Sequence, residues 1–249
     1  MILERFSEGD SLIHRLDPAA RIVAASLLIL VIALADRFST ALLGMLAGAT
    51  FLVLARLPLA AVFGRLLLVN TLILLFWLTL PFSYGDNTLF SLSVLQVRKE
   101  GVLLALLLTL KANAILLLLV ALLATASFTR IGHGLQRLRL PEKLCLLLLF
   151  THRYIFVIHE EFQRLHRSAR LRCFSPSTSL HTYRTYGHLF GMILVRSWNR
   201  GLRVKQAMDL RGFDGRFFTL HEQAMQMKDY LFLGAAGLLA LILMGVELT

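Results

Sequence analysis

Three histidines recur at intervals of seven residues, a spacing that keeps them on one side of a helix. They are His152, His159 and His166. Imidazole is the commonest metal ligand in proteins, but ligands on one helix usually stand three or four residues apart. We therefore interpret these residues as surface histidines of a helix and keep metal ligation as the alternative.

Two polar residues interrupt a long apolar run. Lys111 and Asn113 lie inside Val102–Phe128. Polar groups at membrane depth usually face the interior of a helix bundle and pair there, or they line a substrate path. The simpler interpretation of Lys111 is structural pairing, or extension of its amine towards the membrane surface. A role in coupling or substrate passage is the alternative.

Two similar segments follow basic amphipathic stretches. Ser168–Phe174 contains Leu-Arg-Cys-Phe, and Gln206–Phe213 contains Leu-Arg-Gly-Phe. An arginine in the last turn of a helix interacts favourably with the helix dipole, which alone would explain one such segment. Two copies that stand 39 residues apart in the basic window, with Arg172 and Arg211 in the same place, weigh against coincidence.

The chain lacks the signatures of several enzyme classes. It has no G-x-x-x-x-G-K-[ST] phosphate loop, no G-x-S-x-G nucleophile elbow and no H-E-x-x-H zinc pair. Paired carboxylates are absent from its apolar runs, although proton-coupled transporters and lipid transferases use such acids. These absences disfavour an ATPase, an esterase, a zinc protease and a proton-coupled transporter.

The composition indicates an integral membrane protein. Of 249 residues, 57% are hydrophobic and 16% are charged, and the mean hydropathy is +0.71. Soluble domains are typically about 45–50% apolar and about 25% charged. This chain has too many apolar and too few charged residues for a soluble domain of its size.

Apolar runs of about 20 residues can cross a membrane as helices. The candidate spans are Ile22–Ala35, Ala41–Ala55, Leu66–Phe82, Val102–Phe128 and Tyr230–Val246. A further run, Leu144–Ile158, is short and contains His152 and Arg153, and we expect it to lie in the membrane surface. The leader before Ile22 is acidic, unlike the start of a secretory signal, so we do not expect cleavage.

The excess positive charge is concentrated in one window. Residues 129–216 carry 14 arginines, two lysines and five acids, and this surplus of 11 equals the net charge of the chain. Loops rich in arginine and lysine stay on the cytoplasmic side. This rule places the N-terminus and the basic window inside and the C-terminus outside. It also keeps Leu144–Ile158 from crossing, because a crossing there would translocate the arginines.

Helical periodicity continues through the basic window. An apolar stripe that starts at Tyr154 predicts one helix, and a second is expected from about His188 to Arg211, with Gly212 after its end. The residues expected to pack these coupling helices are Phe162, Leu165, Ala169, Val195, Trp198 and Leu202. The expected fold is all-α, a polytopic membrane bundle of about five spans. Its parts are four spans at 1–143, a surface helix with coupling helices at 144–216, and a final span at 217–249.

These segments resemble the transmembrane T-component of energy-coupling-factor (ECF) ABC transporters, especially the cobalt-type, CbiQ-like members. That family has two cytoplasmic helices that end in Ala-Arg-Gly motifs. Leu171-Arg172-Cys173 and Leu210-Arg211-Gly212 stand in their place. The opening run from Gly9 to Pro18, and Leu140-Pro141 followed by an apolar run and Arg153, are also similar to the family. The resemblance covers nearly the whole chain.

The resemblance implies a non-catalytic coupling subunit of a cobalt importer in the bacterial inner membrane. Arg172, Cys173, Arg211 and Gly212 would dock on two separate ATPase subunits, which use the ATP, and this chain would bind no cofactor or metal. The membrane helices would hold a substrate-capture subunit within the lipid bilayer. Leucine replaces the motif alanine twice. Cys173 replaces a glycine, so we expect another helix-end geometry there.

Two other functions fit the sequence less well. An intramembrane enzyme that held phosphate on basic loops would need acids or a nucleophile at the membrane face, and few are present. A scaffold could bind anionic lipid through the arginine-rich helices. A nucleic acid partner is not expected, because the arginines lack interleaved stacking aromatics. Dependence on an ATPase partner distinguishes the transporter from both alternatives.

Overall fold

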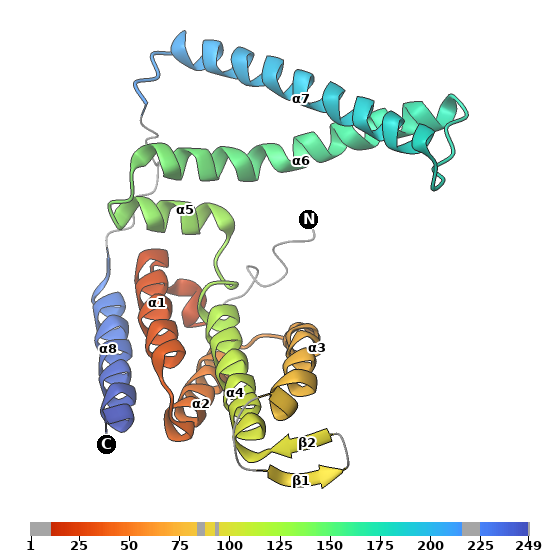
Figure 1. Cartoon of the computed structure of the whole chain (residues 1–249). Coiled ribbons are helices and arrows are strands. Elements are labelled where there is room, and N and C mark those ends of the chain that lie inside the picture. Colours follow the sequence, from red (N-terminus) through yellow and green to blue (C-terminus); the bar gives the residue numbers. More distant parts are fainter. Residues whose placement is uncertain (1–10, 84–87, 93–94, 216–224, 249) are drawn as a thin grey trace. The chain divides into compact units, whose positions relative to one another are not determined.

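The computed structural model describes residues 11–83, 88–92, 95–215 and 225–248 (Figure 1). The chain forms two compact units, one of Met1–Leu138 with Gln223–Thr249 and one of Arg139–Glu222. The first residues of the opening run, Gly9 and Asp10, lie outside the described residues, as does the expected boundary between 216 and 217.

The first unit consists of apolar helices and one short hairpin. Its elements are the 3₁₀ turn η1 (Ile13–Arg15), α1 (Pro18–Leu34), α2 (Phe38–Ala55), α3 (Leu59–Ser83), β1 (Thr88–Leu92), β2 (Leu95–Arg98), α4 (Lys99–Leu122), α5 (Phe128–Arg137) and α8 (Met227–Leu248). Among the described residues, α2, α3, α4 and α8 are long and apolar enough to span a membrane, and α1 is shorter. The all-α membrane bundle predicted from the sequence is confirmed. The antiparallel hairpin β1–β2 is an addition that hydropathy did not indicate.

Helix α1 lies in the core of this unit. Asp17 caps it by accepting a hydrogen bond from the Ala19 N–H at 2.8 Å, and Pro18 occupies the first turn, where its missing N–H costs nothing. Its almost fully buried apolar side chains include Ala24, Ala25, Leu28 and Ile32. The helix has 17 residues and is about 26 Å long, slightly less than the hydrocarbon core of a bilayer.

Glycines allow α2 to pack closely against its neighbours. Gly44 and Gly48 have the small-xxx-small spacing common between membrane helices. A Cβ atom on Gly48 would lie 2.9 Å from the Cβ of Leu117 and 3.2 Å from the carbonyl oxygen of Ala114, both on α4. A Cβ atom on Gly44 would lie 2.7 Å from Cδ1 of Ile32 on α1. A larger residue at Gly48 would push α2 away from α4, whereas one at Gly44 would first displace the end of the Ile32 side chain.

Helix α8 is bonded to the start of the chain at both of its ends. Asp229, which is buried, accepts a hydrogen bond from the backbone N–H of Asp17 at 2.8 Å. At the other end, Glu247 accepts hydrogen bonds from the Asp36 N–H and the Thr40 hydroxyl, each at 2.8 Å. The two carboxylates attach the last helix to the beginnings of α1 and α2.

The fourth apolar run is not one helix, and its expected end at Phe128 was wrong. Helix α4 ends at Leu122, and α5 begins at Phe128. Ser127 caps α5, since its Oγ accepts a hydrogen bond from the Arg130 N–H at 3.4 Å. A serine cap favours a new helix start because it satisfies an N–H that has no partner within the helix.

The second unit contains two long helices, α6 (Glu142–Leu171) and α7 (Leu180–Asp209), of 30 residues each. Leu144–Ile158 and the amphipathic stretch after it form one continuous helix, because no proline or glycine interrupts them. Helix α7 begins before the expected start at His188. Ser179 caps it there by accepting a hydrogen bond from the Thr182 N–H at 3.3 Å.

Candidate docking site at two helix ends

Helix α6 ends in a hydrogen-bonded turn around Cys173. The Phe174 N–H donates to the carbonyl oxygen of Ala169 at 3.2 Å, and the Cys173 N–H donates to that of Arg170 at 3.1 Å. This pair of bonds is the Schellman arrangement, which satisfies carbonyl groups that a helix end would otherwise leave unpaired. The φ angle of Cys173 is 63°, in the left-handed region.

Helix α7 ends in the same turn. The Phe213 N–H donates to the carbonyl oxygen of Met208 at 3.1 Å, and the Gly212 N–H donates to that of Asp209, also at 3.1 Å. The φ angle of Gly212 is 75°. Each donor and acceptor stands 39 residues after its counterpart in α6, so the two ends share one backbone register.

Cysteine does not change the geometry of the first end, and our expectation for Cys173 was wrong. Cys173 and Gly212 both occupy the left-handed region, at 63° and 75°. This region costs a residue with a Cβ atom about 1–2 kcal/mol, whereas glycine enters it freely. The two hydrogen bonds of the turn hold Cys173 there. The first end therefore has the shape that a glycine would give it.

Both ends present an arginine beside a leucine. Arg172 and Arg211 are exposed, and within the described part of the chain neither forms an ion pair. Leu171 is 87% exposed and Leu210 is 89% exposed. A guanidinium is a rigid fork of hydrogen-bond donors. Next to an exposed leucine, it suits a protein partner that offers a carboxylate or carbonyl group beside an apolar surface.

The two ends are separated by most of the length of α7 (Figure 1). The ring centroid of Phe174 lies 6.3 Å from that of His181 and 5.7 Å from that of Tyr186, so the end of α6 lies beside the first turns of α7. From Tyr186 to Arg211, a rise of 1.5 Å per residue gives a distance of about 40 Å. This separation suits two partner surfaces better than one groove.

A small apolar contact joins α6 and α7. Leu165 of α6 packs with Leu189 and Ile193 of α7, and all three are buried. Phe162 and Tyr186 pack against this cluster. Among the residues expected to pack the coupling helices, Leu165 is therefore in the contact, Phe162 is at its edge, and Ala169 is half-buried.

The expected packing residues of α7 lie outside this contact. Val195 is 60% exposed, Trp198 is 70% exposed and Leu202 is 43% exposed. Sequence reasoning missed Leu189 and Ile193, whose spacing of four residues was the available signal. Helix α7 carries more than one apolar stripe, and spacing alone does not tell which stripe faces α6.

An ion-pair network crosses between the helices next to this contact. Glu161 of α6 pairs with Arg196 of α7, and it lies 4.0 Å from Arg164 of its own helix. The hydrogen bond from Arg196 is the main cause that lowers the pKa of Glu161 below its usual 4.5. The charges of Arg196, Arg164 and Arg200 act in the same direction. Glu161 is therefore ionised at neutral pH.

The three regularly spaced histidines of α6 do not converge on one point. The ring centroid of His152 lies 5.6 Å from that of Phe156, edge to face, and His166 stacks on Phe162 at 5.9 Å. In the described ranges, no three His, Cys, Asp or Glu side chains are grouped so that they could hold a metal ion.

The polar residues of α4 are paired within the first unit. Lys111 Nζ lies 3.4 Å from Oδ1 of Asp36, in the connection between α1 and α2. The side-chain amide of Asn113 exchanges two hydrogen bonds with that of Asn70 on α3, each at 3.1 Å. These bonds link α4 to α3 and to the connection between α1 and α2, and they pair the polar groups that interrupt its apolar run.

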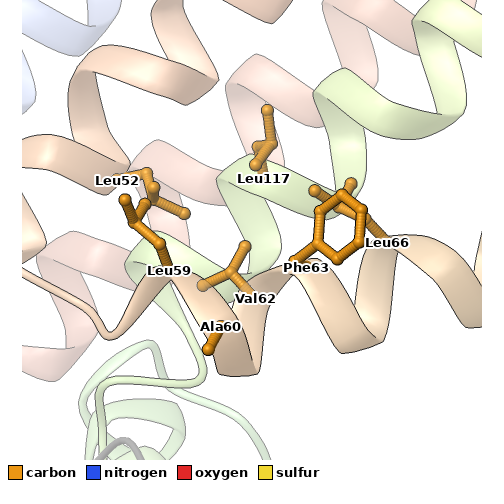
Figure 2. Close-up of a pocket in the computed structure, with 7 residues that line it drawn as sticks. All are labelled: Leu52, Leu59, Ala60, Val62, Phe63, Leu66 and Leu117. Atoms are coloured by element: carbon orange, nitrogen blue, oxygen red, sulfur yellow. The ribbon is translucent and has the colours of Figure 1, made fainter.

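An apolar hollow of about 390 Å³ opens between α2, α3 and α4 (Figure 2). Its lining residues are Leu52, Leu59, Ala60, Val62, Phe63, Leu66 and Leu117. Because all these side chains are apolar, the hollow suits an apolar group such as a lipid chain or a side chain of a membrane partner.

Comparison with known proteins identifies the family. Residues 9–222 match CbiQ, the cobalt transport protein family. The chain belongs to this family. With four helices in the described residues that are long and apolar enough to span a membrane, this CbiQ-family chain is a multi-pass membrane protein.

Individual relatives align over different shares of the chain. This CbiQ-family chain is 27% identical over 224 residues to the energy-coupling factor transporter transmembrane protein EcfT of Leuconostoc gelidum subsp. gasicomitatum, which covers 86% of this chain and 84% of that protein. It is 29% identical over 112 residues to nickel permease LarQ of Lactiplantibacillus plantarum, covering 45% of this chain and 40% of LarQ. A Methanocaldococcus jannaschii protein is 26% identical over 143 residues, covering 56% of this chain and 53% of that protein. The chain therefore spans about half or less of the last two relatives.

Proposed function

We propose that this CbiQ-family chain is the transmembrane coupling subunit of an ECF-type importer whose cargo is cobalt ions. The observation that carries the proposal is the repeated helix end, with Arg172 and Arg211 on matching turns about 40 Å apart. A repeated element suits two partner subunits of similar shape. The family description, cobalt transport protein, and the name of the EcfT relative support the transport role and the cargo.

In this proposal the chain is not an enzyme and binds no cofactor, and two separate ATPase subunits bind and hydrolyse the ATP. Each ATPase subunit holds one helix end. The contact between α6 and α7 is small and consists of an apolar cluster and the Glu161–Arg196 pair. Movement of the ATPase subunits therefore changes the angle between the two helices. A change of angle moves the Gly212 end of α7, which lies far along the helix from this contact, relative to α6, and rigid elements transmit motion in this way.

The exposed apolar surfaces suit a membrane substrate-capture subunit. On α3, Leu72 is 67% exposed and Leu75 is 61% exposed, and on α7 Trp198 is 70% exposed. Large apolar side chains of this kind need lipid or protein around them. In the proposed arrangement the protein lies in the bacterial inner membrane, with its N-terminus and the α6–α7 pair on the cytoplasmic side.

The test is a pull-down of the tagged full-length chain in mild detergent, with co-purifying chains identified by mass spectrometry. The wild type is expected to recover an ATPase subunit, and the Arg172→Ala/Arg211→Ala variant is expected to lose it. Arg153→Ala is the matched control, because Arg153 is also an exposed arginine of α6 but stands 19 residues before Arg172, outside both matching turns.

Three outcomes would oppose the proposal. Recovery of the ATPase with the double variant would show that Arg172 and Arg211 are not needed for docking. Equal loss of the ATPase with Arg153→Ala would show that removing any exposed positive charge weakens binding, whatever its position. If the wild type recovered no ATPase under conditions that preserve complexes, the enzyme and scaffold alternatives would take precedence. Cobalt uptake by cells that carry the complete transporter provides the second readout, and uptake should fall in the double variant alone.

A further inference from the structure

The two helix ends share a backbone but differ in charge. The matching turns align the end of α6 with the end of α7, residue by residue. Cys173 corresponds to Gly212, and every other pair likewise stands 39 residues apart. Over 167–173 the first end carries three arginines and no acid, a charge of +3. Over 206–212 the second end carries one aspartate and one arginine, a charge of zero.

The difference is greatest at one pair of positions. Arg170 in the last turn of α6 corresponds to Asp209 in the last turn of α7. Carbonyl groups at a helix C-terminus carry partial negative charge, so an arginine there is favourable and an aspartate is unfavourable. Asp209 is exposed, and no ion pair to it occurs in the described part of the chain. The stability of α7 therefore does not explain why an aspartate stands at position 209.

The charge difference lies in the last turns of the two helices, directly before each docking arginine. Arg167 and Arg170 stand three residues apart on one side of α6, and Arg170 comes two residues before Arg172 at the helix end. All three are exposed. Their counterparts beside Arg211 are Gln206 and Asp209, which are also exposed. A partner groove that approaches Arg172 meets further positive charge, and one that approaches Arg211 meets a carboxylate.

We infer that the two helix ends are non-equivalent docking elements, and that the Cys173 end takes a strongly acidic ATPase-subunit groove, whereas the Gly212 end takes a groove with a basic or hydrogen-bond-donating group opposite Asp209. This inference rests on the proposed function. Charge complementarity of this kind selects between partners and orients them, because a like charge in the groove would be repelled. Two different ATPase subunits would thus be placed in one orientation, and two identical subunits would bind the two ends with unequal salt dependence.

The experiment measures binding of the purified ATPase subunits to full-length, detergent-solubilised variants that keep one working end. Arg211→Ala leaves the Cys173 end, and Arg172→Ala leaves the Gly212 end. When salt rises from about 0.05 M to about 0.5 M, affinity through the Cys173 end is expected to fall roughly tenfold or more, and affinity through the Gly212 end by less than about threefold.

Charge reversals assign the effect to the paired positions. Arg170→Asp in the Arg211→Ala background should flatten the salt dependence, and Asp209→Arg in the Arg172→Ala background should steepen it. Arg153→Asp changes the net charge as much as Arg170→Asp does, at an exposed position 17 residues earlier in α6, and should leave the salt dependence as it is. If one-ended variants bind too weakly to measure, the same reversals in the wild-type background provide the comparison.

Equal salt dependence at the two ends would overturn the inference, and so would equal flattening by Arg153→Asp. Either result would leave the proposed function intact, because the ATPase subunits would still bind through the arginines. Failure of the wild type to bind the ATPase subunits at any salt concentration would instead overturn the proposed function, and this inference with it.

Discussion

The matching turns of α6 and α7 show, at the scale of single residues, how a backbone conformation limits the choice of residue. Gly212 and Cys173 have φ angles of 75° and 63°. No atom lies within 4 Å of the place where a Cβ atom on Gly212 would stand. The difference between glycine and cysteine at Gly212 is therefore backbone strain, not a clash with neighbouring side chains.

We expect Cys173→Gly to stabilise the end of α6 and Gly212→Cys to destabilise the end of α7, each by about 1 kcal/mol. Hydrogen exchange of the amides in each turn measures this directly, because about 1 kcal/mol changes local opening roughly fivefold. Cys173→Ser is the control, since it keeps a Cβ atom and should change little. Slower exchange after Gly212→Cys would contradict the assignment of strain.

At the scale of elements, the sequence predicted the apolar helices better than their ends. Hydropathy located α2, α3, α4 and α8, because membrane helices need long apolar runs. The start of α5 depends on one capping serine, Ser127, and the start of α7 depends on Ser179. The matching arginines of the candidate site were visible in the sequence, but the glycine-like conformation of Cys173 needed the structure.

Close packing of α2 against α4 makes Gly48 sensitive to any added side chain. Gly48→Ala places a Cβ atom 2.9 Å from Leu117 Cβ and close to the Ala114 carbonyl oxygen, so we expect a loss of about 1–3 kcal/mol. Gly237→Ala on α8 is the control, since its Cβ atom would meet nothing within 4 Å. Thermal unfolding in detergent compares the two variants. Equal unfolding temperatures for Gly48→Ala and the wild type would show that α2 and α4 are not in close contact.

Acid should weaken the connection between α6 and α7. The bond from Arg196 lowers the pKa of Glu161 below its usual 4.5, so the carboxylate stabilises the folded pair above that value. This stabilisation is lost as the pH falls from about 4.5 through the lower folded pKa. Glu161→Gln should therefore be less stable than the wild type at pH 7, and the difference should shrink on acidification. A difference that stays constant with pH would exclude the ion pair as its cause. Glu160→Gln is the control, because Glu160 is exposed and its ion pair with Arg164 lies within α6 and does not join the two helices.

At the scale of the whole molecule, the number of crossings decides on which side each terminus lies. Four helices of the described residues are long enough to span, and α1 adds a fifth apolar helix of 17 residues. A helix about 26 Å long is short for a bilayer, but local thinning of the membrane accommodates such a mismatch at small cost. If α1 crosses as well, the chain has five crossings, and we expect the two termini on opposite sides of the membrane.

Reporter fusions test this count. With the basic α6–α7 pair inside, a fusion at Leu248 should show alkaline phosphatase activity and no green fluorescence, because that phosphatase matures outside the cytoplasm and the fluorescent protein matures within it. The matched fusion at Pro176, between α6 and α7, should show the opposite pattern. The charge distribution favours this pattern, since an outward Pro176 would carry the arginine surplus of 129–216 across the membrane against the positive-inside rule. Fluorescence at both positions would mean that α8 does not cross. Phosphatase activity at both would place α6 and α7 outside, where no ATPase subunit could reach Arg172 or Arg211.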